Sequence, residues 1–395
     1  MRKSLAVLAL FAVVGLCPNS FAAVPLPIVL TNDDNATAGA NSATAYHLNT
    51  TSGGLTLLAQ LKTGGTGLGM GYFAETDTAI ESNGACVFVI NSGSDTISSF
   101  AAPSYAKTGD AGIPGMFSTN GSGGSIALSP NGKLLVSGNS GTLNISLWSV
   151  GTACKLTHVA DYVPSIGADY FSPLAFTPDG KHLVVPAPDF SGAEIFSVGA
   201  NALTDVNNVS WAALSSCVAG CFPAGLDFTN DSAVVVFGNA TSAQTSVLSA
   251  NIGAGGLSNP LNWNITNSAG AMNPNVPWFS KAGAAGNGEL YIGMSGFGSG
   301  VPSGEVTATF VESPLSITVE GAGTLIPTPQ EFLGTIRTIG ATGAGAGGGM
   351  MVIAEFPNQI QTAKIGAGGI LTLGPITTDA SAAGLLSISV FPNNR

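Results

Sequence analysis

Short apolar runs separated by turn residues recur along most of the chain. The three clearest copies begin at Ser125, Pro173 and Gly225, and they read SIALSPNGKLLVSGNSGTLNISLWSV, PLAFTPDGKHLVVPAPDFSGAEIFSV and GLDFTNDSAVVVFGNATSAQTSVLSANI. Each copy contains an apolar run, a turn with Asn or Asp, a Val-rich run, a polar loop and a third run. Runs of this length, bounded by Gly, Asn, Asp and Ser, are typical of β-strands joined by hairpins. The pattern therefore predicts a repeated all-β unit.

Weaker copies flank these three units. AIESNGACVFVINSGSDTISSF precedes them, and GNGELYIGMSGFGSGVPSGEVTATFV and AGGGMMVIAEFPNQIQTAKI follow. The turns recur at intervals of about 46 to 60 residues, which is typical of β-propeller blades. They fall near Asn83, Asn131, Asp179, Asp231, Asn287, Gly347 and Asn393. Because Asn and Gly tolerate positive φ best, we expect the tight hairpin turn whose two central residues both have positive φ.

The two ends of the chain hold complementary parts of one further unit. The segment that begins at Pro25 supplies a second, third and fourth strand but lacks the first. The C-terminal AGLLSISVFPNNR supplies a first strand and a turn and then stops. Joined, they complete one blade. We therefore predict a seven-bladed β-propeller with four-stranded antiparallel blades over residues 23–395, a single domain whose terminal strands share one blade.

Residues 1–22 have the features of a secretory signal peptide. Arg2 and Lys3 precede an apolar stretch from Leu5 to Leu16, and small residues suited to cleavage lead up to Ala22. Beyond the first twenty residues no apolar run reaches the roughly 18 residues that span a bilayer. We expect cleavage after Ala22, no transmembrane segment, and a secreted or periplasmic protein.

The composition is unusual for a globular protein. The chain is 45% hydrophobic and 8% charged and has 54 Gly, whereas about a quarter of residues are charged in ordinary globular domains. This disfavours long exposed helices and coiled coils. The formal net charge of −11 makes nucleic acid a poor partner. We expect a monomer.

Four cysteines remain after the predicted cleavage: Cys86, Cys154, Cys217 and Cys221. An even count in an exported protein favours disulfides, although four cysteines allow three pairings. Cys217 and Cys221 are close enough to close a small loop. A metal site is not expected, because His47, His158 and His182 lie far from these cysteines and from each other in the sequence.

Segments such as LSPNGKLLVSGN and VFVINSGSDTISSF resemble the YVTN-type and lactonase-like seven-bladed propellers of bacteria. The resemblance covers nearly the whole mature chain, and it rests on a structural repeat. It implies the propeller fold, and it implies a binding site on the face that carries the loops between second and third strands and the links between blades.

Acidic and amide side chains occur in these loops. The residues expected at this rim are Asp33, Asp34, Asn91, Asp95, Asn139, Asp189 and Asn239. Such a rim suits a sugar, a cation such as Ca²⁺, or a positively charged partner. The alternative is that Asn and Asp are simply favourable hairpin-loop residues. No other cofactor is predicted.

Asp227 and Arg337 are unusual because both fall in predicted innermost strands. Asp227 stands where other copies have Ala79, Ala127 and Ala175. Buried charges need partners. The two could form a structural ion pair with each other, could pair with Glu331, or could hold a ligand in the central channel.

Standard catalytic motifs are missing. The chain has no Gly-x-Ser-x-Gly elbow, and its GAGAGG segment leads into an apolar run typical of a strand. The first hypothesis is therefore a binding scaffold for a protein or carbohydrate. The second is a lactonase-like hydrolase or isomerase that acts on a sugar lactone in the channel through Asp227, Arg337 and a rim carboxylate such as Glu75. A quinone-dependent dehydrogenase is disfavoured, because four Trp without a recurring motif offer little cofactor stacking.

Overall fold

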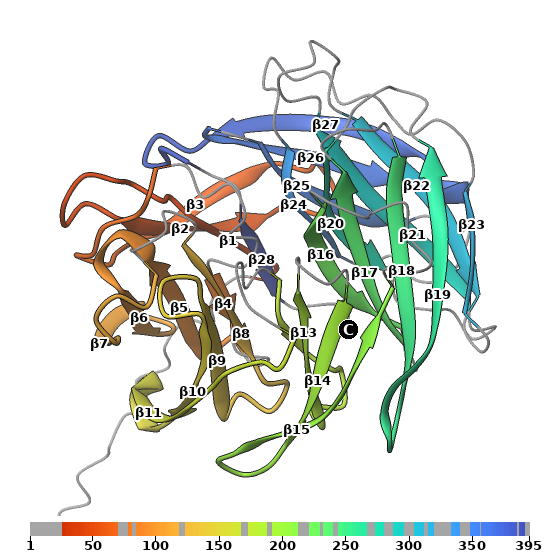
Figure 1. Ribbon diagram of the computed structural model, residues 1–395. Coiled ribbons are helices and arrows are strands. Elements are labelled where there is room, and N and C mark those ends of the chain that lie inside the picture. The colour runs from red at the N-terminus through yellow and green to blue at the C-terminus, as the bar shows by residue number, and fades with distance from the viewer. Residues whose placement is uncertain are drawn as a thin grey trace, which may run out of the picture.

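A computed structural model of the chain has the form of a ring of β-sheets (Figure 1). It describes residues 26–69, 78–80, 84–117, 123–166, 173–187, 192–211, 221–229, 232–239, 244–266, 273–279, 287–295, 304–311, 315–319, 333–339, 348–355, 357–384 and 387–391. Within these residues the strands form seven four-stranded antiparallel sheets, and α-helices are absent. The predicted all-β, seven-bladed propeller is confirmed.

Each sheet is one blade, whose strands run in order from the innermost outward. Blade 1 consists of β28 (Ile388–Phe391), β1 (Ile28–Asn32), β2 (Ser42–Leu48) and β3 (Leu55–Lys62). Blade 2 consists of β4 (Thr78–Ile80), β5 (Cys86–Asn91), β6 (Thr96–Ala101) and β7 (Ala106–Ala111). Blade 3 consists of β8 (Gly124–Leu128), β9 (Leu134–Asn139), β10 (Asn144–Val150) and β11 (Leu156–Tyr162). Blade 4 consists of β12 (Ala175–Phe176), β13 (His182–Ala187), β14 (Gly192–Val198) and β15 (Leu203–Ser210).

The remaining blades follow the same order. Blade 5 consists of β16 (Cys221–Phe228), β17 (Ser232–Asn239), β18 (Gln244–Gly253) and β19 (Gly256–Thr266). Blade 6 consists of β20 (Asn273–Phe279), β21 (Asn287–Ser295), β22 (Gly304–Val311) and β23 (Ser316–Val319). Blade 7 consists of β24 (Leu333–Ile339), β25 (Gly349–Glu355), β26 (Gln359–Ile365) and β27 (Leu371–Thr378). Three short 3-10 helices occur in the described loops: η1 (Ser92–Ser94), η3 (Thr152–Cys154) and η4 (Ala367–Gly369).

Contacts between the first strands of neighbouring blades show that these strands line the centre. β28 contacts β4, β4 contacts β8, and β8 contacts β12, while β16, β20, β24 and β28 contact one another in turn. Between blades 4 and 5 the contact runs from β13 to β16. The blades therefore follow one another around a closed ring.

The two ends of the described chain close this ring. β28 pairs antiparallel with β1, with Ile28 opposite Phe391 and Thr31 opposite Ile388. In Figure 1 the dark blue β28 lies beside the red β1 near the centre of the ring. The prediction that the terminal strands share one blade is confirmed.

In blades 1, 2, 3 and 7, burial falls from the second strand to the outermost strand. Every residue of β1, β5, β9 and β25 is buried, whereas β3 is largely exposed or half-buried. The reason is that apolar clusters fill the space between neighbouring blades. One cluster joins Phe88 and Ile90 of blade 2 to Leu135 and Trp148 of blade 3. Strands buried on both faces have little room for charged side chains, which explains the low charge content.

The first hairpin turn of blades 3 and 4 has a geometry that differs from the expected one. Gly132 and Gly180 have φ of 70° and 69°, but Asn131 and Asp179 are not in the positive-φ region. The backbone N–H of Gly132 donates to the carbonyl of Ser129 at 2.8 Å, and Pro130 lies between them. A Pro at the second position and a left-handed Gly at the fourth fit a type I turn. The expectation of two central residues with positive φ is therefore wrong for these turns.

One disulfide joins two neighbouring blades. Cys86, the first residue of β5, is bonded to Cys154 of η3 in blade 3, across 68 positions of the sequence. Cys217 lies outside the described residues, so the expected small loop closed by Cys217 and Cys221 is not tested. The predicted signal peptide, residues 1–22, also lies outside them. No helix in the described part of the chain is long and apolar enough to cross a membrane.

Candidate functional site

The loops between second and third strands meet the linkers between blades on one face, which we call the loop face. Asn41 of the β1–β2 loop donates its backbone N–H to Gly65 of the linker that follows blade 1, at 3.0 Å. Gly93 of the β5–β6 loop donates to Thr66 of the same linker at 2.8 Å. The opposite face carries the other hairpin turns, and we call it the turn face. Asp33, Asp34, Asn91 and Asp95 all belong to the loop face, whereas Asp189 lies outside the described residues.

Asp34 and Asp95 bind backbone groups of the linkers. Asp34 Oδ1 accepts the N–H of Leu68 at 2.8 Å. The two carboxylate oxygens of Asp95 accept the N–H groups of Gly115 and Phe117, each at 2.9 Å. Both aspartates have positive φ, 44° and 55°, a conformation that Asp tolerates better than most residues. These carboxylates hold the linkers after blades 1 and 2 in place.

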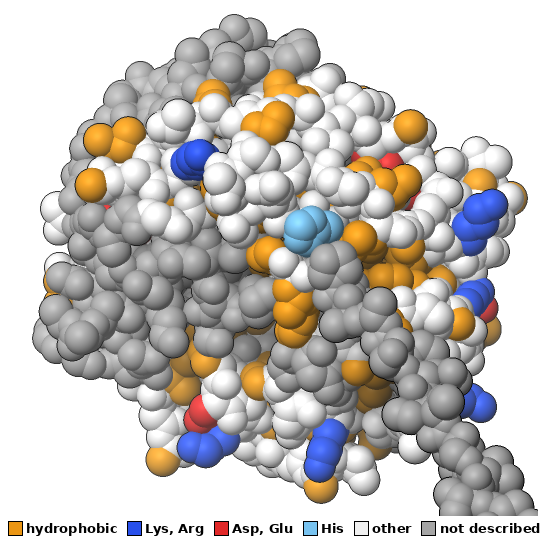
Figure 2. All heavy atoms as spheres, turned by 180° about the vertical axis from the view of Figure 1, so that it is seen from behind, with side chains coloured by type: hydrophobic (Ala, Val, Ile, Leu, Met, Phe, Trp, Pro, Cys, Tyr) orange, Lys and Arg blue, Asp and Glu red, His pale blue; other side chains and the backbone are white. Residues whose placement is uncertain are grey.

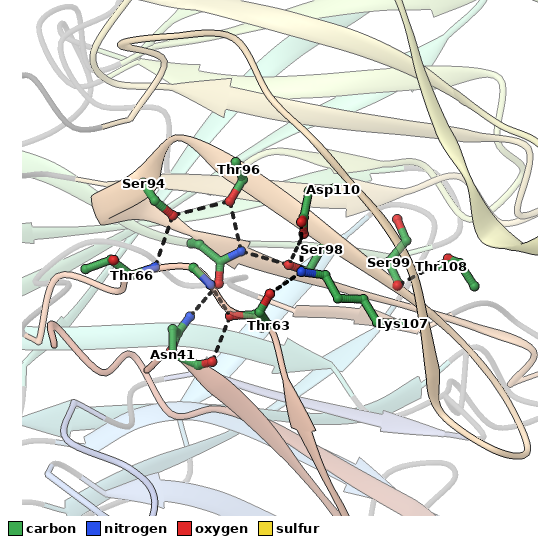
Figure 3. Close-up of polar contacts among 12 residues, drawn as sticks. Asn41, Thr63, Thr66, Ser94, Thr96, Ser98, Ser99, Lys107, Thr108 and Asp110 are labelled. Atoms are coloured by element: carbon green, nitrogen blue, oxygen red, sulfur yellow. Dashed lines mark hydrogen bonds and ion pairs between the residues drawn. The ribbon is translucent and has the colours of Figure 1, made fainter. Parts of the chain in front are cut away.

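Asn91 is hydrogen-bonded to residues of blades 1 and 2, and its partners Asn41, Thr96 and Ser98 are labelled in Figure 3. Its Oδ1 accepts from Asn41 Nδ2 at 2.9 Å. Its Nδ2 lies 3.1 Å from Thr96 Oγ1 and 3.0 Å from Ser98 Oγ. Ser98 in turn donates to Asp110 at 2.6 Å. The amide of Asn91 therefore has partners on both of its polar atoms.

Blade 3 repeats this arrangement with one difference. Asn139 Nδ2 lies 2.7 Å from both Asn144 Oδ1 and Ser146 Oγ, and Ser146 donates to Asp161 at 2.6 Å. Asn139 is fully buried, yet its Oδ1 has no hydrogen-bond partner in the described structure. Blade 3 thus leaves free an acceptor oxygen that blade 2 satisfies with Asn41.

Glu355, which the sequence analysis missed, is a further buried acceptor on this face. It is the last residue of β25 and is 0% exposed, and neither carboxylate oxygen finds a hydrogen-bond partner among the described groups. Its side chain lies on the same face of β25 as Met351 and Ile353, which pack against Tyr291 of blade 6. Burial raises the pKa of Glu355 to about 7.

A positional signal in the sequence could have identified Glu355. The second strands of four other blades end in an asparagine: Asn32, Asn91, Asn139 and Asn239. In blade 7 the corresponding strand, GMMVIAE, ends in a glutamate. An ionisable group therefore replaces a neutral amide at a recurrent position of the loop face.

Glu194 is a second acidic residue that the sequence analysis missed. It lies in β14 and is 1% exposed. Its Oε2 accepts the backbone N–H and the hydroxyl of Ser165, at 2.7 and 2.9 Å, and the N–H of Ile166 at 3.2 Å. Its Oε1 has no partner within the described residues. Burial raises the pKa of Glu194, although the bonds to Ser165 oppose this effect.

The two charges predicted for innermost strands do lie in such strands. Asp227 of β16 is fully buried, and its Oδ1 accepts the N–H of Phe228 at 2.7 Å. Arg337 of β24 is half-buried and stands opposite Val352 of β25. β16 and β24 each contact β20, so blade 6 lies between their blades. Glu331 and Glu75, the other carboxylates considered for the channel, lie outside the described residues.

The histidines lie away from the loop face. His182 begins β13 directly after a turn on the turn face. His158 lies in the outer strand β11, 3.0 Å from Asp161, and its ring packs edge-on against Trp148. His47 Nε2 lies 3.2 Å from the carbonyl of Leu26. No group of three or more His, Cys, Asp or Glu side chains is placed to hold a metal ion in the described part of the chain.

The turn face carries a pocket between blades 4 and 5. Thr177, Asp179, Lys181, His182 and Ile252 contribute to its walls. Lys181 Nζ lies 3.1 Å from Asp179 Oδ2, and both side chains are exposed. The positive charge of Lys181 and the negative charge of Asp179 therefore offset each other. On the side of the molecule seen in Figure 2, the described Lys and Arg side chains stand apart and form no basic patch.

Comparison with known proteins relates the chain to solved propellers. No protein-family model matches the sequence, and no curated protein matches it. A candidate 6-phosphogluconolactonase from Bacteroides fragilis superposes with a TM-score of 0.64 and 15% identity, over 92% of this chain and 98% of that one. A protein from Lactobacillus plantarum gives a TM-score of 0.64 and 15% identity, over 92% and 99%. A candidate 6-phosphogluconolactonase from Bacteroides uniformis gives 0.65 and 12%, over 92% and 99%.

Identities this low show a shared fold and nothing beyond it. At that level the predicted likeness to lactonase-like seven-bladed propellers is confirmed. The function therefore has to be argued from the loop face itself.

The Asn91 network gives a testable prediction about the loop face. Replacing Asn91 with Ala removes its side-chain hydrogen bonds to Asn41, Thr96 and Ser98. Each hydrogen bond contributes about 0.5–1.5 kcal/mol net, so the free energy of unfolding should fall by about 1–3 kcal/mol. Urea unfolding followed by tryptophan fluorescence measures it. The control is Thr142→Ala, which removes an exposed hydroxyl bonded to Asn144. An Asn91→Ala variant as stable as this control would contradict the prediction.

Proposed function

We propose that the protein is an exported propeller that binds a hydroxyl-rich ligand of carbohydrate type on its loop face. The observation that carries the proposal is Glu355, a fully buried carboxyl group whose two oxygens lack hydrogen-bond partners among the described residues. Asn139 Oδ1 and Glu194 Oε1 are likewise buried oxygens that lack a hydrogen-bond partner among the described residues. All three are acceptors, and sugar hydroxyl groups are donors that match them.

Unpaired buried acceptors are unfavourable in the free protein. Each costs about 1–3 kcal/mol, and each such group in a native structure calls for an explanation such as a catalytic or ligand-binding role. The aspartates of this face, Asp34 and Asp95, are already bonded to linker backbone. Glu355 is therefore the carboxyl group of the described loop face with the most capacity left for a ligand.

Charge favours a neutral ligand over a phosphorylated one. The formal net charge is −11, and within the described residues no Lys or Arg side chain is bonded to Glu355, Asn139 or Glu194. A phosphate group would meet buried acceptors and negative charge. The ligand class that fits is a neutral sugar or a neutral sugar lactone.

Two features support export of the protein from the cytoplasm. Residues 1–22 carry the sequence features of a signal peptide. The Cys86–Cys154 disulfide suits an oxidising compartment outside the cytoplasm. We propose a secreted or periplasmic protein.

Glu355→Gln tests the binding role directly. Gln keeps the size of the side chain but removes a carboxyl group whose pKa burial raises to about 7. A raised pKa destabilises the folded state as pH rises from the unfolded value to about 7, so at pH 8 the variant should be more stable by about 2–3 kcal/mol. Binding of glucose or glucono-1,5-lactone should weaken about tenfold, the effect of one lost hydrogen bond. Calorimetric titration and urea unfolding measure the two effects.

The matched control is Asp179→Asn, which removes an exposed carboxylate from the turn face and should leave binding unchanged. If Glu355→Gln and Asp179→Asn bind the sugar as wild type does, Glu355 has no part in the site. If wild type binds none of the neutral sugars, the proposed ligand class is wrong.

Hydrolysis of a sugar lactone is the second candidate function, and one observation favours it. A carboxyl group with a pKa of about 7 can take up and release a proton at neutral pH, which is what a general acid or base requires. If the protein is such an enzyme, it should hydrolyse glucono-1,5-lactone faster than buffer does, with an inflection in the pH profile near 7. Glu355→Gln should lower this rate at least about a hundredfold. A rate equal to that of buffer would leave the binding scaffold as the function.

A further inference from the structure

Two buried carboxyl groups lie within hydrogen-bond reach of one hydroxyl group, that of Thr31, where the ring closes. Asp33 follows β1 in the β1–β2 loop and is 0% exposed, and Asp379 follows β27 in the linker to β28 and is 1% exposed. Thr31 Oγ1 lies 3.3 Å from Asp33 Oδ1 and 3.2 Å from Asp379 Oδ2. A hydroxyl group has a single proton, so it can donate to only one of these oxygens at a time.

The backbone joins the same two segments. Ala383 of the linker donates its N–H to the carbonyl of Asp33 at 2.8 Å. Asp379 itself donates its N–H to the carbonyl of Asn358, also at 2.8 Å. The linker between blade 7 and β28 is thus fastened to the β1–β2 loop of blade 1 beside the carboxyl pair.

The other side chains bonded to the pair are neutral. Ser42 Oγ donates to Asp33, and Thr44 Oγ1 lies 3.1 Å from its Oδ1. The hydroxyl of Tyr46 is hydrogen-bonded to Asp379, and burial together with the charge on Asp379 raises the pKa of Tyr46, which keeps that hydroxyl neutral.

The described charged groups of the neighbouring elements do not neutralise the negative charge of Asp33 and Asp379. Asp34, the next residue, directs its Oδ1 to the N–H of Leu68. Lys62 of β3 stands opposite Ser42 and is exposed to solvent. Among the described residues, no cationic side chain forms an ion pair with Asp33 or Asp379.

Two neighbouring buried carboxyl groups cannot both ionise without a large cost in electrostatic free energy. A buried carboxyl beside a second carboxylate keeps its proton to higher pH, and the two groups titrate as a unit. Consistent with this geometry, burial and then the charge on Asp379 raise the pKa of Asp33 to about 7. Below about pH 7, Asp33 therefore holds a proton.

We propose that Asp33 and Asp379 form an acid-tightened clasp that fastens the linker of blade 7 to the β1–β2 loop and so secures the ring closure. The ligand class proposed above plays no part in this argument. The clasp is strongest in acid, where the proton is present in both the fastened and the opened states. As pH rises, the opened state loses the proton first, because water solvates its carboxylate, and opening becomes easier.

The sign and range of the effect follow from the two states. An exposed Asp in the opened state titrates near 3.9, and Asp33 in the fastened state titrates at about 7. Between these values the fastened state binds more protons, so the opening constant rises about tenfold per pH unit and becomes constant above about 7.

Amide hydrogen exchange of the folded protein between pH 5 and 8 tests the clasp. After correction for the intrinsic exchange rate, the protection factor of the Ala383 N–H should fall about tenfold per unit up to pH 7 and then level off. Asp33→Asn, which keeps the shape and cannot ionise, should make this protection independent of pH. The control is Asp95→Asn, which alters a carboxylate of the same face that binds linker backbone without a second acid, and it should keep the wild-type slope.

Asp379→Asn supplies a second variant if Asp33→Asn does not fold. It removes the neighbouring charge, so Asp33 should lose its proton at a lower pH, and the protection factor should level off below pH 7. A wild-type protection factor that does not change with pH would overturn the clasp. So would a wild-type pH profile in both the Asp33 and Asp379 variants.

Discussion

The pairing of β28 with β1 is the constraint on which the rest of the structure depends. Each blade covers the faces of its two neighbours, so every second strand can be buried on both sides only if the ring is closed. The cluster between blades 7 and 1 shows what closure protects: Val29 and Ile388 pack there with Met350, Val352 and Ala354, all largely shielded from water. Apolar burial of this kind is the main favourable contribution to folding. The low charge content of the chain is its counterpart, because few strand positions reach solvent.

Closure also determines what the loop face is made of. The linkers must carry the chain from the outer strand of one blade to the inner strand of the next, and their backbone groups need partners. Asp34, Asp95 and Glu194 supply those partners for three linkers. Acidic residues that look available for a ligand in the sequence are thus largely occupied by structure. Glu355 differs because it ends a second strand and is bonded to none of the described linker residues.

The sequence repeat made the fold predictable. It did not make the side-chain contacts of the loop face predictable. Blade number, strand order and the shared terminal blade follow from the spacing of turns and from the two incomplete end units. The side-chain partners of Asp33, Asp34 and Asp95 could not be predicted, because they depend on where linkers from other blades pass. Glu355 has a signal in the sequence, because Asn32, Asn91 and Asn139 end the corresponding strands of other blades and a glutamate ends this one. The turn at Asn131 has one too, because Pro130 suits the second position of a type I turn.

The central claim is that the loop face, and Glu355 within it, receives the ligand. Hydrogen exchange of the whole protein with and without a saturating neutral sugar locates the contact surface most directly. The account predicts slower exchange at the amides around Glu355 and in the loops that begin at Asn91 and Asn139, with no change at the Asp179 turn on the opposite face. Protection confined to the turn face, or none on either face, would contradict it.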